Sequence, residues 1–186
     1  RNILAVTGDP IPEAERGDVK SVFNLNSFML AGFINELNHS EFLEDEIFIG
    51  GALNINAKNF NVELKRAQIK LENGVNFLMT QPAFSDESIN ALKTAKDVLK
   101  CKILGGILPI VSYRNAIFLN NEIPGINVPE YIINRFEGKS REQAESIGVS
   151  TAIEICKKII PFIDGIYIIT PFNRWKMICK IIEEIR

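Results

Sequence analysis

The stretch that decides the fold is Val75-Asn76-Phe77-Leu78-Met79-Thr80-Gln81-Pro82, a short apolar run that ends in polar residues and a proline. Two other segments share this design: Asn2–Val6 leads into Thr7-Gly8-Asp9-Pro10, and Ile166–Ile169 leads into Thr170-Pro171-Phe172-Asn173-Arg174. Continuously apolar runs of this length are typical of strands buried on both faces, as in parallel sheets. Ligands of parallel β/α folds bind at the carboxyl ends of the strands. We therefore interpret the three polar segments as parts of one rim.

Helical patterns separate the expected strands, which lie at about 2–6, 46–50, 75–79, 102–108 and 165–169. We expect helices over about 26–37, 62–73, 85–99, 112–119, 141–160 and 174–185, and a short one near Pro129. Strand–helix units in series define a parallel α/β protein. An open doubly wound sheet and a segment of a (β/α)₈ barrel both fit this order. Because a full barrel takes about 250 residues, a chain of 186 residues that opens on a strand suits about five of eight barrel units, truncated at the N-terminus.

The composition argues against several classes of protein. With a net charge of −2, the chain has no basic field that would attract nucleic acid. We find no apolar run long enough to span a membrane and no signal peptide, so we expect no membrane partner. The cysteines Cys101, Cys156 and Cys179 are widely spaced, and we interpret them as buried, reduced thiols of a cytoplasmic protein. A single histidine, His39, argues against a His-rich metal site and Ser-His-Asp chemistry, so we expect no metal.

The polar residues of the rim each allow a functional and a structural interpretation. Asp9 could accept hydrogen bonds from a heterocycle, or it could stabilise its own turn. The Gln81 amide both donates and accepts, which suits a pterin, flavin or nicotinamide edge, although it could instead anchor the loop at Pro82. Phe172 and Arg174 offer an aromatic face and a guanidinium for a carboxylate or phosphate. Alternatively, Asn173 could be the N-cap of the last helix and Arg174 solvated.

Two basic residues on the second helix add a further candidate. Lys70 and Arg66 lie one turn apart and could reach an anionic ligand, or they could belong to a solvated charged face with Glu63 and Glu72. Together these residues indicate a ligand-binding rim, and they do not name a reaction.

Five segments, in order, resemble the methylenetetrahydrofolate reductase family. They are Asn2–Pro10, Phe48–Asn54, Phe77–Phe84, Gly106–Pro109 with Ser112–Arg114, and Thr170–Arg174. The family implies a (β/α)₈ TIM barrel with non-covalent FAD that takes hydride from NADH or NADPH and reduces 5,10-methylenetetrahydrofolate to 5-methyltetrahydrofolate. This flavoprotein chemistry serves one-carbon metabolism and methionine biosynthesis. Residues 1–186 would then form a single partial TIM-barrel reductase domain.

The resemblance also assigns roles to individual positions. It implies catalytic roles for Asp9 and Gln81, with Asp9 beside the flavin's pyrimidine edge. The implied FAD contacts are Thr7, Gly8, Asp9, Gly51, Ala52, Glu63 and Lys70, with Lys70 near a phosphate. The implied substrate contacts are Asp9, Gln81, Leu119, Phe172 and Arg174. Leu53 and Leu119 stand where relatives carry aromatic residues, and Thr7 stands where relatives carry an arginine.

The family's catalytic glutamate lies on a barrel strand that we expect to precede these residues. A second hypothesis is therefore a non-catalytic flavin- or folate-binding module that acts beside a partner domain, and a third is another α/β enzyme with a phosphate-bearing ligand. The Gly50–Asn54 and Ser112–Ala116 runs resemble bacterial reductases fused to a homocysteine methyltransferase half, which implies that domain as a fused or separate partner. Because a partial barrel has open sheet edges, we also expect a homo-oligomer.

Overall fold

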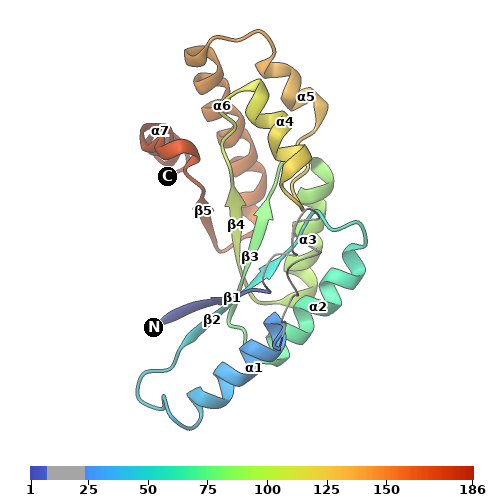
Figure 1. The fold of residues 1–186 in the computed structure, drawn as a ribbon, viewed down its shortest axis with the longest axis vertical. Coiled ribbons are helices and arrows are strands. Elements are labelled where there is room, and N and C mark those ends of the chain that lie inside the picture. The colour runs from blue at the N-terminus through green and yellow to red at the C-terminus, as the bar shows by residue number, and fades with distance from the viewer. Residues whose placement is uncertain (8–23) are drawn as a thin grey trace, which may run out of the picture.

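A parallel sheet of five strands organises the computed structural model, which describes residues 1–7 and 24–186. The strands are β1 (Asn2–Ala5), β2 (Phe48–Leu53), β3 (Phe77–Pro82), β4 (Lys102–Ile107) and β5 (Gly165–Ile168), and they pair in chain order (Figure 1). A doubly wound sheet reverses its strand order at a switch point, whereas barrel strands follow one another in sequence. The observed order confirms the barrel-type arrangement, and the alternative of a doubly wound sheet is wrong.

Helices connect the strands as expected. They are α1 (Ser27–Asn38), α2 (Phe60–Glu72), α3 (Asp86–Leu99), α4 (Tyr113–Glu122), α5 (Glu130–Ile133), α6 (Arg141–Ile159) and α7 (Trp175–Ile185), with the 3₁₀ turns η2 (Asn134–Phe136), η3 (Ile160–Phe162) and η4 (Pro171–Asn173). The helix expected from residue 85 begins with a capping box, in which the Ser85 and Ser88 hydroxyls each accept a hydrogen bond from the other residue's backbone N–H. Among the described residues, no helix combines the length and apolar character that crossing a membrane requires.

Two strands extend further than the sequence suggested. Gly50 and Gly51 lie inside β2, and Gln81 and Pro82 lie inside β3. At Gly50 the reason is packing: a Cβ atom there would stand 2.5 Å from the Phe77 ring of the neighbouring strand. Glycine thus makes room for an aromatic side chain across the sheet and does not mark a turn.

The two faces of the sheet differ in burial. Ile49, Leu78 and Ile103 point toward the helices and are fully buried. On the opposite face, Leu4 is 42% and Phe48 46% exposed, and the Phe48 ring stacks on Phe77 at 5.3 Å between centroids. The helices therefore cover one face of the sheet, and the other carries partly exposed apolar side chains.

Some expected buried positions are exposed. On α2, only Ala67 of the apolar stripe is buried, while Val62 and Ile69 lie at the surface. The expectation of buried cysteines is correct for Cys156, where burial raises the pKa of the thiol to about 11, but wrong for Cys179, which is exposed on α7. Val62, Ile69 and Cys179 lie on the sides of their helices that face away from the core.

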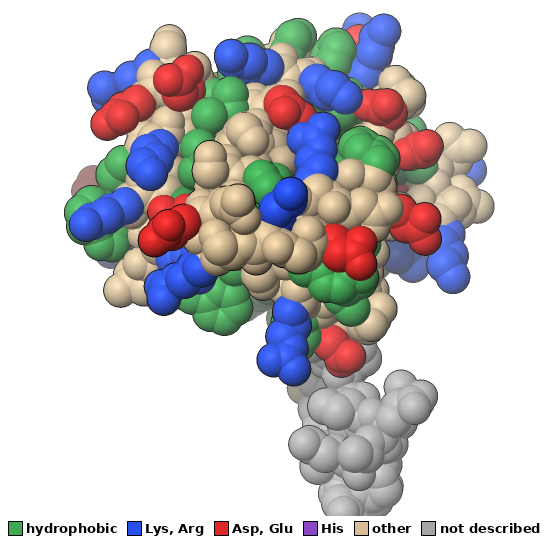
Figure 2. All heavy atoms as spheres, turned by 90° about the horizontal axis from the view of Figure 1, so that it is seen from above, with side chains coloured by type: hydrophobic (Ala, Val, Ile, Leu, Met, Phe, Trp, Pro, Cys, Tyr) green, Lys and Arg blue, Asp and Glu red, His purple; other side chains and the backbone are tan. Residues whose placement is uncertain are grey.

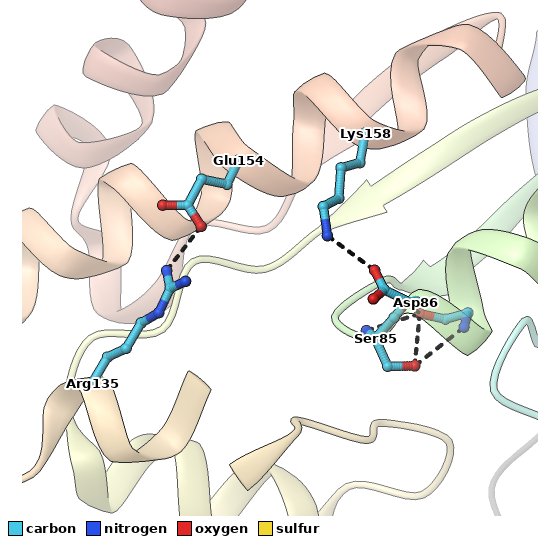
Figure 3. A network of polar contacts seen from close by, with 6 residues as sticks. Ser85, Asp86, Arg135, Glu154 and Lys158 are labelled. Carbon is cyan, nitrogen blue, oxygen red and sulfur yellow. Dashed lines mark hydrogen bonds and ion pairs between the residues drawn. The ribbon is translucent and has the colours of Figure 1, made fainter. Parts of the chain in front are cut away.

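Ion pairs connect α6 to its neighbours. Lys158 Nζ lies 2.9 Å from Asp86 Oδ1 at the start of α3, and Arg135 Nη1 lies 2.8 Å from Glu154 Oε2 (Figure 3). All four side chains are substantially exposed, so each pair contributes at most about 1 kcal/mol. Burial of its apolar side chains therefore contributes more than these ion pairs to holding α6 on the sheet.

Candidate functional site

The candidate site lies where the strands end. Gln81 in β3 and the segment Phe172–Arg174 after β5 are at this carboxyl end, as predicted, and Thr7 follows β1. Gly8 and Asp9 fall outside the described residues. Figure 2 shows the molecule from above the view of Figure 1, with basic and acidic side chains interspersed among apolar ones.

Gln81 occupies a β-bulge. The pairing of β3 with β4 runs regularly to Met79 opposite Leu104 and resumes at Pro82 opposite Gly106, so β3 carries one extra residue. Bulges commonly re-aim a side chain next to an active site. A ligand-binding role for the half-buried Gln81 amide is compatible with this irregularity and stays a prediction.

The turn after β5 is strained. Phe172 and Asn173 adopt left-handed backbone conformations, with φ of 49° and 58°. Such conformations cost non-glycine residues about 1–2 kcal/mol, and Phe172 recovers little of this by packing because it is 76% exposed. The alternative in which Asn173 caps the last helix is wrong: α7 begins at Trp175 and has no side-chain cap.

Arg174 is held by a carboxylate. Its Nη1 lies 3.4 Å from Glu145 Oε2 on α6, and its side chain is only 21% exposed. The alternative of a fully solvated arginine is therefore wrong. One ion pair leaves most of the guanidinium's five N–H donors for another partner.

Arg174 and Phe172 line a pocket of about 500 Å³. Its other lining residues come from the loop after β4 and from α4, and they include Ser112, Arg114, Asn115 and Phe118. Two guanidinium groups and two aromatic rings suit a ligand with a flat apolar part and an anionic end. This volume lies in the range of small-molecule sites.

Leu119, which the resemblance assigned to the substrate, packs in the core. Phe118, one residue earlier on α4, is about half exposed and lines the pocket. The assignment of Leu119 stays a prediction, while Phe118 supplies the aromatic surface at this point of the rim.

The predicted cofactor residues of α2 converge on the end of β2. Lys70 Nζ donates to the Ala52 carbonyl, and the Glu63 carboxylate accepts a hydrogen bond of 3.0 Å from the Asn54 N–H. Burial lowers the pKa of Lys70, and the nearby Glu63 carboxylate partly opposes this. The alternative of a solvated charged face is wrong for Lys70, which is buried, but it describes the exposed Arg66.

The donor set at this point is compatible with an anionic cofactor. An ammonium has three N–H donors, and Ala52 accepts only one of those on Lys70. A phosphate beside Lys70 would also offset the desolvation of the buried ammonium. Thr7 is exposed at the end of β1, where its hydroxyl accepts from the Ser27 N–H at 3.2 Å.

Sequence reasoning missed several residues of the rim. Asn56 Nδ2 donates to the carbonyls of Pro82 and Gly125, and so connects the loop after β2 to the end of β3. A polar residue soon after a strand was the signal that singled out Gln81, and it would have found Asn56 as well. Arg114 and Phe118 carry no such signal, because exposed residues on a helix are ordinary. Among the described residues, no cluster of His, Cys, Asp and Glu could hold a metal ion.

A parallel sheet in sequential order, with helices on one face and a pocket at its carboxyl end, defines a protein of the β/α-barrel class. Residues 1–186 match the family described as methylenetetrahydrofolate reductase. The chain belongs to this family.

A curated relative supports this assignment. The chain is 24% identical over 168 residues to "Methylenetetrahydrofolate reductase 1" of Schizosaccharomyces pombe. The match covers 86% of this chain and 27% of the relative, so the chain spans about a quarter of that protein's length.

Proposed function

We propose that this chain forms part of a flavin-dependent reductase that converts 5,10-methylenetetrahydrofolate to 5-methyltetrahydrofolate with NADH or NADPH as hydride donor. The observation that carries the proposal is the pocket in which Arg174, Arg114, Phe118 and Phe172 meet at the rim, in a chain of this family. A folate has a flat apolar middle and a carboxylate-bearing end, which matches this combination of aromatic rings and guanidinium groups.

The residues of the chain divide the work of binding. Arg174, held by Glu145, binds a carboxylate of the substrate, and Phe172 covers its flat part. Gln81 offers both a donor and an acceptor to the edge of the pterin or the nicotinamide. Asp9, outside the described residues, would lie near the cofactor by the family resemblance alone.

The cofactor that these residues would hold, FAD, would supply the hydride transfer between the two substrates. Lys70 would hold a phosphate of this cofactor, and Glu63 fixes the loop after β2, beside Gly51 and Ala52. Thr7 would contribute a hydroxyl from the end of β1. Since Glu63 and Lys70 both bond the backbone of residues 52–54, their contribution includes the shape of the loop as well as its charge.

The same two contacts support the second candidate function, a non-catalytic flavin- or folate-binding module beside a partner domain. Glu63 and Lys70 both hold the backbone at the end of β2, and a cofactor site shaped in this way would bind flavin whether or not turnover follows. A homocysteine methyltransferase domain, fused or separate, is the partner we propose for either function, together with self-association and a cytoplasmic location suited to free thiols.

Activity of the complete natural protein that contains these residues separates the candidates. Oxidation of NADH or NADPH is followed with methylenetetrahydrofolate and, separately, with a quinone that accepts electrons from flavin without using the folate site. Turnover with both acceptors supports the reductase. Flavin or folate binding without turnover favours the module, and binding of neither rejects both.

A further inference from the structure

A side chain of β5 forms a hydrogen bond with the backbone of β3 next to Gln81, and β4 lies between the two strands. The Tyr167 hydroxyl, on β5, reaches across β4 and donates to the backbone carbonyl of Thr80 on β3, with 2.5 Å between the oxygens. β5 and β3 are not neighbours in the sheet, so this side chain connects two strands that the ladder leaves apart. Gln81 is the next residue after Thr80.

The space for this contact exists because the intervening residue is Gly106. A Cβ atom at Gly106 would stand 2.7 Å from the Tyr167 hydroxyl oxygen and 2.8 Å from the Thr80 carbonyl oxygen. Both distances are too short for a methyl group at residue 106. Glycine on β4 therefore permits the hydroxyl of β5 to reach β3.

At the bulge, both the side-chain and the backbone oxygen of Thr80 accept hydrogen bonds from the neighbouring strands. The Gly106 N–H donates to the Thr80 side-chain Oγ1 at 3.0 Å, while the backbone carbonyl takes the Tyr167 hydroxyl. Pro82, where regular pairing resumes, has no N–H to give. Side-chain hydroxyls thus replace part of the backbone ladder where the strand departs from regular geometry.

Burial raises the pKa of Tyr167 above its ordinary value of 10.0. The phenol therefore stays protonated at neutral pH and remains a donor.

We propose that Tyr167 is a positioning residue: by holding the Thr80 carbonyl across β4, its hydroxyl fixes the bulge that presents the Gln81 amide to the ligand. The ligand part of this statement rests on the proposed function, whereas the fixing of the bulge does not. Tyr167 acts through Gln81 and need not touch the substrate itself.

Hydrogen exchange of the complete natural protein tests the fixing of the bulge without any substrate. In Tyr167→Phe, which removes one oxygen and keeps the ring, we expect amides of residues 79–84 to exchange about tenfold faster, as the loss of one hydrogen bond would allow. Tyr131→Phe is the matched control, since Tyr131 is an exposed tyrosine on α5, and should leave this segment unchanged. Unchanged exchange in Tyr167→Phe would overturn the proposal even if the protein reduces folate.

A double-mutant cycle tests the link to Gln81. We expect Tyr167→Phe to lower kcat/KM for methylenetetrahydrofolate about fivefold in the wild type and to have no further effect in Gln81→Leu, because residues that act as a unit are not additive. An equal loss in both backgrounds would show a merely structural role and overturn the proposal. If the wild type does not reduce folate, the proposed function fails, and the exchange experiment still decides whether Tyr167 holds the bulge.

Discussion

The two ends of the sheet are built on different principles. At the amino end, the Asp164 carboxylate, just before β5, accepts hydrogen bonds from Lys96 Nζ, Lys102 Nζ and the Ile103 N–H at 2.5, 3.0 and 2.9 Å. At the carboxyl end, β3 bulges at Gln81 and the backbone of Phe172 is left-handed. At the amino end the Asp164 carboxylate is paired within the protein, whereas the carboxyl end has a strained backbone and hydrogen-bond donors left for a ligand.

This contrast suggests how the molecule divides stability from function. Backbone strain persists where the surrounding structure over-determines it, and it concentrates at functional sites. Conserving regular geometry at one end lets the other carry a bulge and a strained turn. We expect mutations at the amino end to change stability alone, and mutations at the carboxyl end to change ligand binding.

Gly106→Ala should have the largest effect. The new methyl group would overlap the Thr80 carbonyl oxygen, which is backbone and cannot rotate away, so we expect a loss of about 3 kcal/mol in unfolding free energy. Gly165→Ala is the matched control on β5, because its methyl group would meet only the flexible end of Leu104. Chemical denaturation measures both variants, and an equal, small loss would show that the rim is looser than described.

Asp164→Asn should come next and should spare activity. Lys96 and the Ile103 N–H hold the pKa of the Asp164 carboxyl far below its ordinary 3.8, with Lys102 assisting. A carboxyl with a depressed pKa stabilises the fold above its ordinary pKa, and this stability is lost as pH falls through 3.8 and below. We expect the variant to lose about 2 kcal/mol at neutral pH.

Measured stability between pH 2 and 7 checks this sign: the wild type should lose more on acidification than Asp164→Asn. Asp86→Asn, which removes a carboxylate from an exposed ion pair, should change stability by less than about 0.5 kcal/mol. A fall in substrate affinity in Asp164→Asn would contradict the expectation that the amino end of the sheet affects stability alone.

Gln81→Leu should impair folate reduction at least about tenfold, equivalent to about 1.4 kcal/mol of transition-state stabilisation. The side chain is half-buried in a bulge, so leucine should be tolerated while the amide's hydrogen bonds are lost. Gln68→Leu, on the exposed side of α2, is the control. Steady-state kinetics that are the same for both variants would remove Gln81 from the site.

Phe172→Gly should have a smaller effect on stability than Gly106→Ala or Asp164→Asn, and the opposite sign. Glycine adopts a positive φ without steric cost, and the exposed Phe172 ring contributes little packing. We expect a gain of about 1 kcal/mol in stability together with weaker substrate binding. Phe118→Ala, which removes the other pocket ring from ordinary helical backbone, should weaken binding without that gain.

The sequence predicts the regular parts of this molecule well. The five strands and the capping box at Ser85 follow from hydrophobic pattern and local hydrogen bonding, which neighbouring residues determine. Polar residues at strand ends likewise located Gln81 and Arg174 at one rim. The end of β2 was placed too early because two glycines, Gly50 and Gly51, follow the apolar run, and the Phe77 ring that fills the space beside Gly50 is distant in the sequence.

The remaining features depend on contacts that are distant in the chain. Tyr167 and Thr80 are 87 positions apart, and Arg174 and Glu145 are 29 apart. No pattern among neighbouring residues in the sequence predicts either of these two contacts. The bulge at Gln81 and the left-handed backbone of Phe172 carry no local sequence signal either, so they could be recognised only in the folded structure.

An FAD titration of the purified complete protein, followed by flavin fluorescence and the visible spectrum, tests whether this rim binds the cofactor. We predict saturable binding that weakens about tenfold in Lys70→Met, which keeps the length of the side chain and removes its charge. Binding that is unaffected by Lys70→Met would contradict the cofactor assignment at the end of β2. A protein that does not bind flavin at all would contradict the central claim that this rim serves a flavin-dependent reductase.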